Sequence, residues 1–158
     1  MKIYTILATL AAAAHAAPAE LSSTAAAACT TGDPVVTAGY TIKYAAAVPT
    51  AVQAGVGYQP DAAWAKQHVA ATYTYGVPDP KETGFAYAQF KCQYTCNNAP
   101  SGSSFFVEYV SGRASSSCVC YNELLDPETF VTGNATMVGA WNAICDVTHP
   151  DVPGTKTS

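Results

Sequence analysis

The sequence predicts an α+β fold in which one helix packs on a small antiparallel sheet and three disulfides stabilise the pair. Three observations favour this class: a Cys-x3-Cys pair in a segment of helical periodicity, a Cys-x-Cys pair in a strand-like segment, and an even total of six cysteines. Residues four apart on a helix share a face and lie about 6 Å apart along its axis. Residues two apart on a strand also share a face and lie about 7 Å apart. The matching spacings allow two disulfides side by side between a helix and a strand.

The first half of the chain predicts short elements. Residues 35–44 are rich in β-branched and aromatic side chains and predict one or two strands, broken near Gly39. Residues 45–60 contain mainly Ala, Gly and Val with two prolines, and we expect them to be irregular. Residues 61–71 predict a short helix, because a Pro-Asp pair marks its start. Residues 70–75 predict a strand that ends before a Gly-Val-Pro turn.

The second half has stronger signals. Thr83 is expected to cap a helix that runs to Cys96, with its apolar side chains on one stripe. Residues 104–110 predict a strand, and a Ser-Gly-Arg-Ala-Ser turn leads to a pairing strand over residues 117–124. Residues 138–147 predict a closing strand. The predicted helix therefore packs on an antiparallel sheet formed by these strands.

The cysteines are expected to form three disulfides, in the pairs Cys92–Cys118, Cys96–Cys120 and Cys29–Cys145. The first two pairs follow from the order helix, strand, turn, strand, which makes the second strand run parallel to the helix. An antiparallel arrangement would exchange the partners. The third pair follows by elimination, although six cysteines allow about 15 connectivities.

A metal site is not expected in this chain. Zinc sites use Cys-x2-Cys knuckles or nearby histidines, whereas the cysteine spacings here are x3 and x1. The sequence also contains no glycine-rich phosphate loop, His-x-x-x-His pair or calcium loop. We therefore expect neither a metal nor a cofactor.

The first 16 residues have the pattern of a secretory signal peptide. Lys2 gives a positive start, an uncharged apolar run follows to Ala14, and Ala14-His15-Ala16 matches the small-x-small cleavage signal. The apolar run is shorter than the about 20 residues that cross a bilayer. Cleavage is expected after Ala16, with Ala17 and Ala19 as alternatives.

Three segments are expected after the signal peptide. Residues 17–28 are rich in small side chains and predict a flexible N-terminal arm. Residues 29–147 contain all six cysteines and predict a single disulfide-bonded domain. Residues 148–158 are polar and predict a disordered tail. Because no later segment is long and apolar enough to span a membrane, the product is expected to be secreted and extracellular.

The charge balance argues against one class of partner. Seven Lys and Arg residues face 11 Asp and Glu residues, which gives a formal net charge of −4. A nucleic-acid backbone attracts basic surfaces, and this chain has no run of basic residues. Nucleic-acid binding is therefore not expected.

The cysteine helix, the Phe-Phe strand and the closing Trp-Asn-Ala-Ile-Cys segment resemble a known family. A helix with Cys-x3-Cys, a strand that contains Phe105 and Phe106, and a closing segment from Trp141 to Cys145 are similar to the PAN/apple modules of secreted fungal proteins. The resemblance covers about residues 84–146. It implies a helix cradled by an antiparallel sheet, and a role in protein–protein or protein–carbohydrate contacts without catalytic residues.

The leading hypothesis is a secreted, non-catalytic binding module that recognises an extracellular protein or carbohydrate, as a fungal wall-associated or effector-like protein. A toxin or antimicrobial protein is the first alternative, because Cys-x3-Cys with Cys-x-Cys resembles the cystine-stabilised αβ motif of defensins. The acidic balance argues against attack on anionic membranes. A small secreted hydrolase is the weaker alternative.

The hydrolase alternative depends on a few titratable residues. A serine or cysteine nucleophile needs an adjacent histidine, and the candidates are His68 on the first predicted helix and His149 in the tail. Glu108 shares a strand face with Phe106 and Val110, which is unusual for a carboxylate. Its simplest explanation is an edge strand that faces solvent, and no catalytic residue is assigned.

Tyrosine-rich composition provides the binding candidates. Tyrosine combines an apolar ring with a hydroxyl, which suits both sugar stacking and protein interfaces. We assign ligand contact to Tyr94 on the helix, Tyr109 and Tyr121 on the strands, and Arg113 at the hairpin tip. Asn134 begins the only N-glycosylation sequon, in a predicted loop, and a glycan is expected there.

Overall fold

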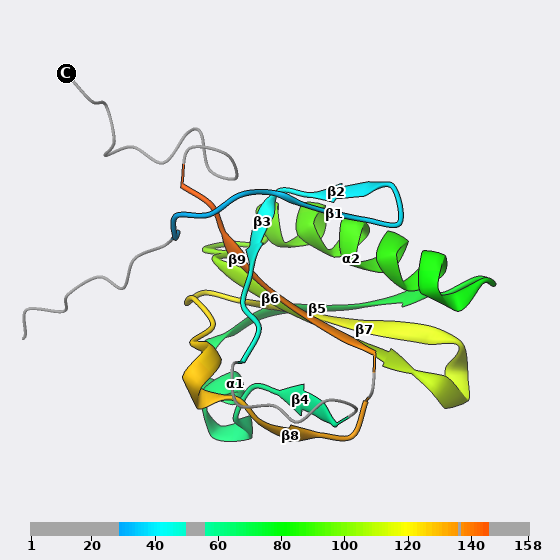
Figure 1. The fold of residues 1–158 in the computed structure, drawn as a ribbon. Helices are drawn as coiled ribbons and strands as arrows, with labels where there is room; N and C mark the ends of the chain where they lie inside the picture. Colours follow the sequence, from blue (N-terminus) through cyan, green and yellow to red (C-terminus); the bar gives the residue numbers. More distant parts are fainter. Residues whose placement is uncertain (1–28, 50–55, 136, 146–158) are drawn as a thin grey trace, which may run out of the picture.

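The computed structural model describes residues 29–49, 56–135 and 137–145 (Figure 1). The predicted signal peptide (1–16), N-terminal arm (17–28) and tail (148–158) lie outside the described residues. The described elements, in chain order, are β1 (Val35–Thr37), β2 (Tyr40–Ile42), β3 (Tyr44–Ala46), β4 (Gly57–Gln59), α1 (Ala62–His68), β5 (Val69–Gly76), α2 (Lys81–Asn97), β6 (Ser104–Val110), β7 (Ser115–Tyr121), β8 (Val131–Gly133) and β9 (Val138–Ala143).

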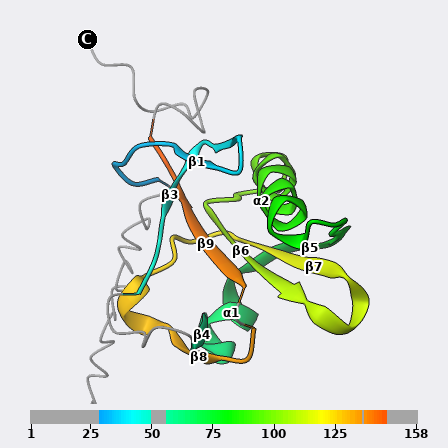
Figure 2. The same ribbon diagram turned by 45° about the vertical axis from the view of Figure 1, so that its right-hand side comes forward.

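Five of these strands form the central antiparallel sheet, in the order β3-β9-β6-β7-β5. The strands β1 and β2 form one separate hairpin, and β4 pairs with β8 in another two-stranded sheet. The α2 helix lies on one side of the central sheet, whereas α1 and the β4–β8 pair lie on the other (Figure 2). The sheet is therefore the middle of three layers.

The α2 layer carries the larger core cluster. Phe85, Ala88, Cys92 and Cys96 recur every three to four residues and are buried against the sheet. Gln89, on the same stripe, is also buried, and its Oε1 accepts a hydrogen bond of 3.0 Å from the indole Nε1 of Trp141. The polar group in the core is thus paired, as buried polar groups generally are.

The disulfides join the pairs that the parallel arrangement predicts. Cys92–Cys118 and Cys96–Cys120 connect α2 to β7, and Cys29–Cys145 connects the two ends of the described domain. Next to the last bridge, Thr30 forms a parallel bridge with Ile144, so the chain ends are also joined by backbone hydrogen bonds.

The opposite face of the sheet carries a second cluster. It contains Phe106, Tyr121, Leu125 and Ala140, with Trp64 of α1 packed against it. The Trp64 and Tyr121 ring centroids are 4.9 Å apart. Asp61 caps α1, since its side chain accepts hydrogen bonds from the Ala63 and Trp64 amides at 2.9 and 3.0 Å.

Several sequence predictions need correction. The short helix predicted over residues 61–71 is confirmed as α1, but the fold prediction of one helix packed on the sheet did not include it: within the described residues, α1 and α2 cover opposite faces of the sheet. The long helix begins at Lys81 after Pro80, so Thr83 lies within it and does not cap it. Glu108 lies on β6, the central strand of the sheet, and the prediction of an edge strand is wrong. The region 45–60 was expected to be irregular, yet it contains β4 and part of β3.

Candidate functional site

The outer side of α2 carries a row of aromatic side chains. Tyr87, Phe90 and Tyr94 are three and four residues apart, which places them on one side of a helix. Tyr87 is 39% exposed and Tyr94 is 46% exposed, while Phe90 is half-buried between them. The cysteine stripe faces the sheet, so this row faces away from the covalent core.

Tyr40 of the β1–β2 hairpin completes the row. Its ring centroid lies 5.6 Å from that of Tyr87 and 5.4 Å from that of Phe90. Phe90 in turn meets Tyr94 edge-on at 5.1 Å. These spacings lie within the range of favourable ring contacts, so the four rings hold one another in place. We name Tyr40, Tyr87, Phe90 and Tyr94 the aromatic surface.

The hairpin that supplies Tyr40 is fixed to α2 by buried polar contacts. The Gln93 Oε1 accepts a 2.8 Å hydrogen bond from the Lys43 backbone N–H, and its Nε2 donates to the Thr41 carbonyl at 3.1 Å. Gln93 is 1% exposed, so both amide ends find partners without water. The two hydrogen bonds of Gln93 therefore hold the hairpin, and with it Tyr40, over the helix.

A cavity of about 200 Å³ adjoins one end of the aromatic surface. Its lining residues come from the hairpin, from the loop before α2 and from the first turns of α2: Tyr40, Pro78, Asp79, Pro80, Thr83, Gly84 and Tyr87. The helix approaches the loop so closely here that a Cβ on Gly84 would lie 2.3 Å from the Pro78 carbonyl oxygen, and only glycine fits. The cavity thus combines aromatic rings with the Asp79 carboxylate and the hydroxyls of Tyr40, Thr83 and Tyr87.

The raised tyrosine pKa values belong to the core and not to this surface. Burial raises the pKa of Tyr44 and of Tyr58 above the ordinary tyrosine range. Burial, and then the negative charge of Glu108, raise the pKa of Tyr121 to about 12. These phenols are neutral at physiological pH, and they act as packing groups rather than as acids or bases.

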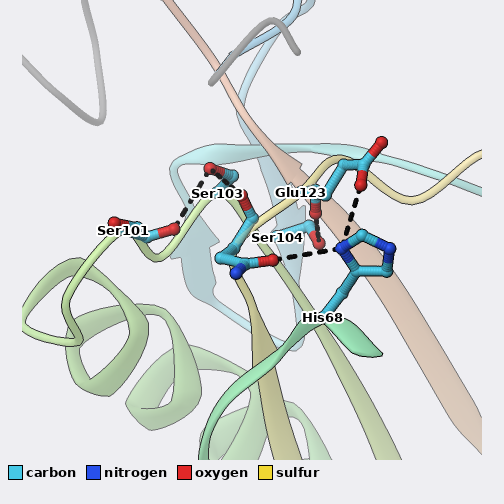
Figure 3. Close-up of polar contacts among 6 residues, drawn as sticks. His68, Ser101, Ser103, Ser104 and Glu123 are labelled. Atoms are coloured by element: carbon cyan, nitrogen blue, oxygen red, sulfur yellow. Dashed lines mark hydrogen bonds and ion pairs between the residues drawn. The ribbon is translucent and has the colours of Figure 1, made fainter. Parts of the chain in front are cut away.

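A polar cluster around His68 has some features of a catalytic site (Figure 3). The His68 Nδ1 lies 2.9 Å from the Glu123 Oε2 and 3.2 Å from the Asn122 Oδ1. Both contacts leave from the same ring nitrogen, and the ring stacks on Trp64 with centroids 4.8 Å apart. A histidine held by a carboxylate is the arrangement that a general base requires.

The serines beside this cluster have other partners. The Ser104 Oγ donates to the Glu123 carbonyl at 2.6 Å, and the Ser103 Oγ lies 3.3 Å from the Ser101 carbonyl. Both serines are at least 96% buried. These hydroxyls bond backbone carbonyls instead of the imidazole, so the cluster fastens the segment after β7 to the end of α1.

The predicted contact residues are not brought together. Tyr94 lies on the aromatic surface, and Arg113 is exposed in the turn between β6 and β7. Tyr109 is half-buried, with the Lys81 ammonium 5.7 Å from its ring centroid. Tyr121 is only 3% exposed in the second core cluster, which removes it from the contact candidates.

Sequence reasoning missed Tyr40, Tyr87 and Phe90. The signal that was present is the spacing of Tyr87, Phe90 and Tyr94, which repeats at helical period on the side opposite the cysteines. Nothing local in the sequence places Tyr40 over this helix, since the two are joined by contacts between distant segments.

The four helix and β7 cysteines are the described group whose geometry could suit a metal. The sulfur atoms of Cys92, Cys96, Cys118 and Cys120 all lie within 4.8 Å of one another and are buried. In this structure they are bonded as two disulfides. The sulfur lone pairs of a disulfide are far weaker ligands than thiolates, which are the species that bind zinc.

Asn134 is exposed and follows β8, on the side of the sheet away from α2. Its sequon partner Thr136 lies outside the described residues.

Among the described residues, no helix has the length and apolar content that a membrane crossing needs. Comparison of the chain with known proteins gave no relative: no family model, no curated protein and no solved structure matches it.

Proposed function

We propose that this chain is a secreted, non-catalytic binding module that holds a neutral oligosaccharide on its aromatic surface. The observation that carries the proposal is the row of four contacting rings, with Tyr87 and Tyr94 exposed at 39% and 46%. Contiguous exposed apolar patches, unlike single exposed side chains, often mark binding sites. The PAN/apple resemblance of the sequence, which implies contacts with proteins or glycans, agrees with this proposal.

The chemistry of the surface favours a sugar over a flat protein partner. The apolar faces of sugar rings stack on aromatic rings, and their hydroxyls need nearby polar partners. Asp79 and Thr83 offer such partners in the adjoining cavity. With about 200 Å³, the cavity is smaller than the roughly 300–1,000 Å³ of pockets for drug-sized ligands. One sugar unit would occupy the cavity while further units stack along Phe90 and Tyr94.

Extracellular location is part of the proposal. Disulfides persist in oxidising compartments, and all six cysteines of this chain are paired. The signal-peptide pattern of residues 1–16 supports export. A glycan at the exposed Asn134 would lie across the sheet from α2 and would leave the aromatic surface free.

Isothermal titration calorimetry of the full secreted chain with neutral hexasaccharides of glucose, mannose and N-acetylglucosamine tests the proposal. We expect saturable binding of at least one sugar, weakened about tenfold by Tyr87→Ala or Tyr94→Ala, which corresponds to about 1.4 kcal/mol for each lost ring. Tyr73→Ala is the matched control, because Tyr73 is 47% exposed but lies on β5.

Two outcomes would overturn the proposal. The first is no heat and no chemical-shift change with any of the three sugars at millimolar concentration. The second is binding that Tyr87→Ala and Tyr94→Ala leave unchanged. If a defined extracellular protein instead bound the chain and lost affinity with these two variants, the aromatic surface would be a protein interface.

A further inference from the structure

The β5 strand forms one border of the central sheet. It spans Val69–Gly76, which makes it the longest strand among the described residues, and it pairs with β7 on one side. No strand of the described part pairs with its other side. An unpaired edge of this length presents a row of free backbone N–H and C=O groups that can pair with another chain.

The register with β7 identifies which backbone groups point outward. The Val77 N–H donates to the Ala114 carbonyl at 2.9 Å, and this pair continues the β5–β7 register beyond Gly76. In an antiparallel ladder, hydrogen-bonded and non-hydrogen-bonded pairs alternate. Tyr75 and Tyr73 therefore bond to β7, whereas the N–H and C=O groups of Thr74 and Thr72 point to the open edge.

The edge lacks the features that usually prevent pairing. Natural edge strands commonly carry lysine, proline or an inward charge that blocks association. The β5 sequence, VAATYTYG, contains no charged residue and no proline, and its register shift is confined to the Val69–Ala71 end. Thr72, Tyr73 and Thr74 are all exposed. Residues 72–76 are thus a continuous, uncharged pairing segment.

We infer that β5 pairs with β5 of a second copy of this chain, in an antiparallel and two-fold symmetric dimer. In a register centred on Tyr73, Thr72 lies opposite the partner's Thr74, and each such pair exchanges both backbone hydrogen bonds. Tyr73 then lies opposite the partner's Tyr73 in a closely spaced non-hydrogen-bonded position. Threonine pairs and aromatic pairs across strands are both stabilising.

A second copy suits this edge because the segment is complementary to itself. Two-fold symmetry brings the same residues together in both directions, so each copy satisfies the groups that the other exposes. Since the segment carries no charge, the net negative charge of the chain is not concentrated at the contact. The inference does not depend on the proposed sugar binding, which uses the outer side of α2.

Sedimentation equilibrium of the full secreted chain tests the dimer. Because one edge strand makes a small interface, the average mass should rise from one chain toward two between about 1 µM and 1 mM. Thr74→Pro removes an outward N–H without breaking the ladder to β7, and Tyr73→Lys places like charges opposite each other. Both variants should weaken association at least about tenfold.

Two controls separate loss of pairing from loss of folding. Thr74→Val keeps the outward N–H and should still form the dimer, and Tyr94→Lys changes an equally exposed ring on α2 and should have no effect. In hydrogen exchange, the amides of Thr72 and Thr74 should become protected as the concentration rises. Those of Tyr73 and Tyr75 should be protected at every concentration.

The proposal is overturned if the chain stays monomeric at millimolar concentration. The open side of β5 would then be a site for an extended segment of another protein instead. It is also overturned if a dimer forms that neither Thr74→Pro nor Tyr73→Lys weakens. Concentration-dependent protection of Thr72 and Thr74 in the unaltered chain, lost at both amides in Tyr73→Lys and at the Thr72 amide in Thr74→Pro, would establish the β5 interface.

Discussion

Each of the two disulfides between α2 and β7 should stabilise the fold less when the other is already formed than when it is the only bridge of the two. Cys92–Cys118 closes a loop with a sequence separation of 26, and Cys96–Cys120 closes one of 24. A disulfide lowers the conformational entropy of the unfolded chain, and on this ground each bridge alone should stabilise the folded state by about 3.5 kcal/mol. Once one bridge exists, the other closes only a ring of about six residues, worth about 2 kcal/mol.

Three variants measure this coupling: one pair replaced by alanine, the other pair replaced by alanine, and all four cysteines replaced. Removal of either bridge alone should cost about 2 kcal/mol, and removal of both about 6 kcal/mol. The double loss therefore exceeds the sum of the single losses by about 1–2 kcal/mol. All four cysteines are 0% exposed, so each pair of substitutions adds a cavity cost of similar size.

Urea denaturation followed by circular dichroism provides the free energies of unfolding, with intact mass confirming that the remaining bridges are formed. Cys29–Cys145 is the control, with a sequence separation of 116. An inner bridge shortens this loop only slightly and should change its contribution by about 0.2 kcal/mol, so losses at the two places should add. A double loss that equals the sum of the two single losses, without the excess of about 1–2 kcal/mol, would refute the shared-ring reasoning.

Three further changes probe the core and the cap. Burial, and then the charge of Glu108, raise the pKa of Tyr121 to about 12, so folding favours the neutral phenol. The associated contribution to the free energy of unfolding, roughly 3 kcal/mol, is present below pH 10 and is lost as the pH rises toward 12. Tyr121→Phe should flatten this alkaline loss in denaturation midpoints measured from pH 8 to 12, and an unchanged slope would contradict it. Gln89→Ala leaves the buried Trp141 indole N–H without its acceptor and should cost about 1–3 kcal/mol in urea denaturation, whereas an unchanged midpoint would exclude that hydrogen bond. Asp61→Ala should cost about 1 kcal/mol by loss of the α1 cap, while Asp61→Asn retains most of it.

The elements with local signals were predictable from the sequence. The strand Ser104–Val110 matches its predicted bounds, because a segment rich in β-branched and aromatic residues lies between two turn clusters. The helix that carries Cys92 and Cys96 was predicted by its stripe, and its contact with β7 by the matching distances that Cys-x3-Cys on a helix and Cys-x-Cys on a strand span. The parallel direction was predicted by the order helix, strand, turn, strand. These features depend on neighbours within a few residues or on a covalent constraint.

The elements held only by distant contacts were not predictable. The strands β4 and β8 have three residues each and pair although nearly half of the chain separates them. Their close approach depends on glycine, since a Cβ on Gly133 would lie 2.8 Å from the Tyr58 carbonyl carbon. A three-residue segment without periodicity carries no local signal of such a partner.

The same limit explains the outcome at the candidate site. Alternation along β7 shows that Tyr121 lies on the face opposite Cys120, but it does not show that α1 and β4–β8 cover that face. Exposure of Tyr87 and Tyr94 likewise depends on where the β1–β2 hairpin lies. Sequence patterns indicate which side chains share a face, whereas the neighbours of that face follow from the whole fold.

The Cys29–Cys145 bridge gives the domain a mechanical property. Its two Cα atoms are 5.1 Å apart, and the residues between them include every helix and strand described. A pulling force applied through the chain segments on either side of this bridge would pass along the sulfur–sulfur bond and leave the fold between unloaded. Only after reduction could the pulled chain extend, by roughly 400 Å at full stretch for a separation of 116 residues. A module anchored at one end and tethered at the other would thus keep its aromatic surface intact under tension.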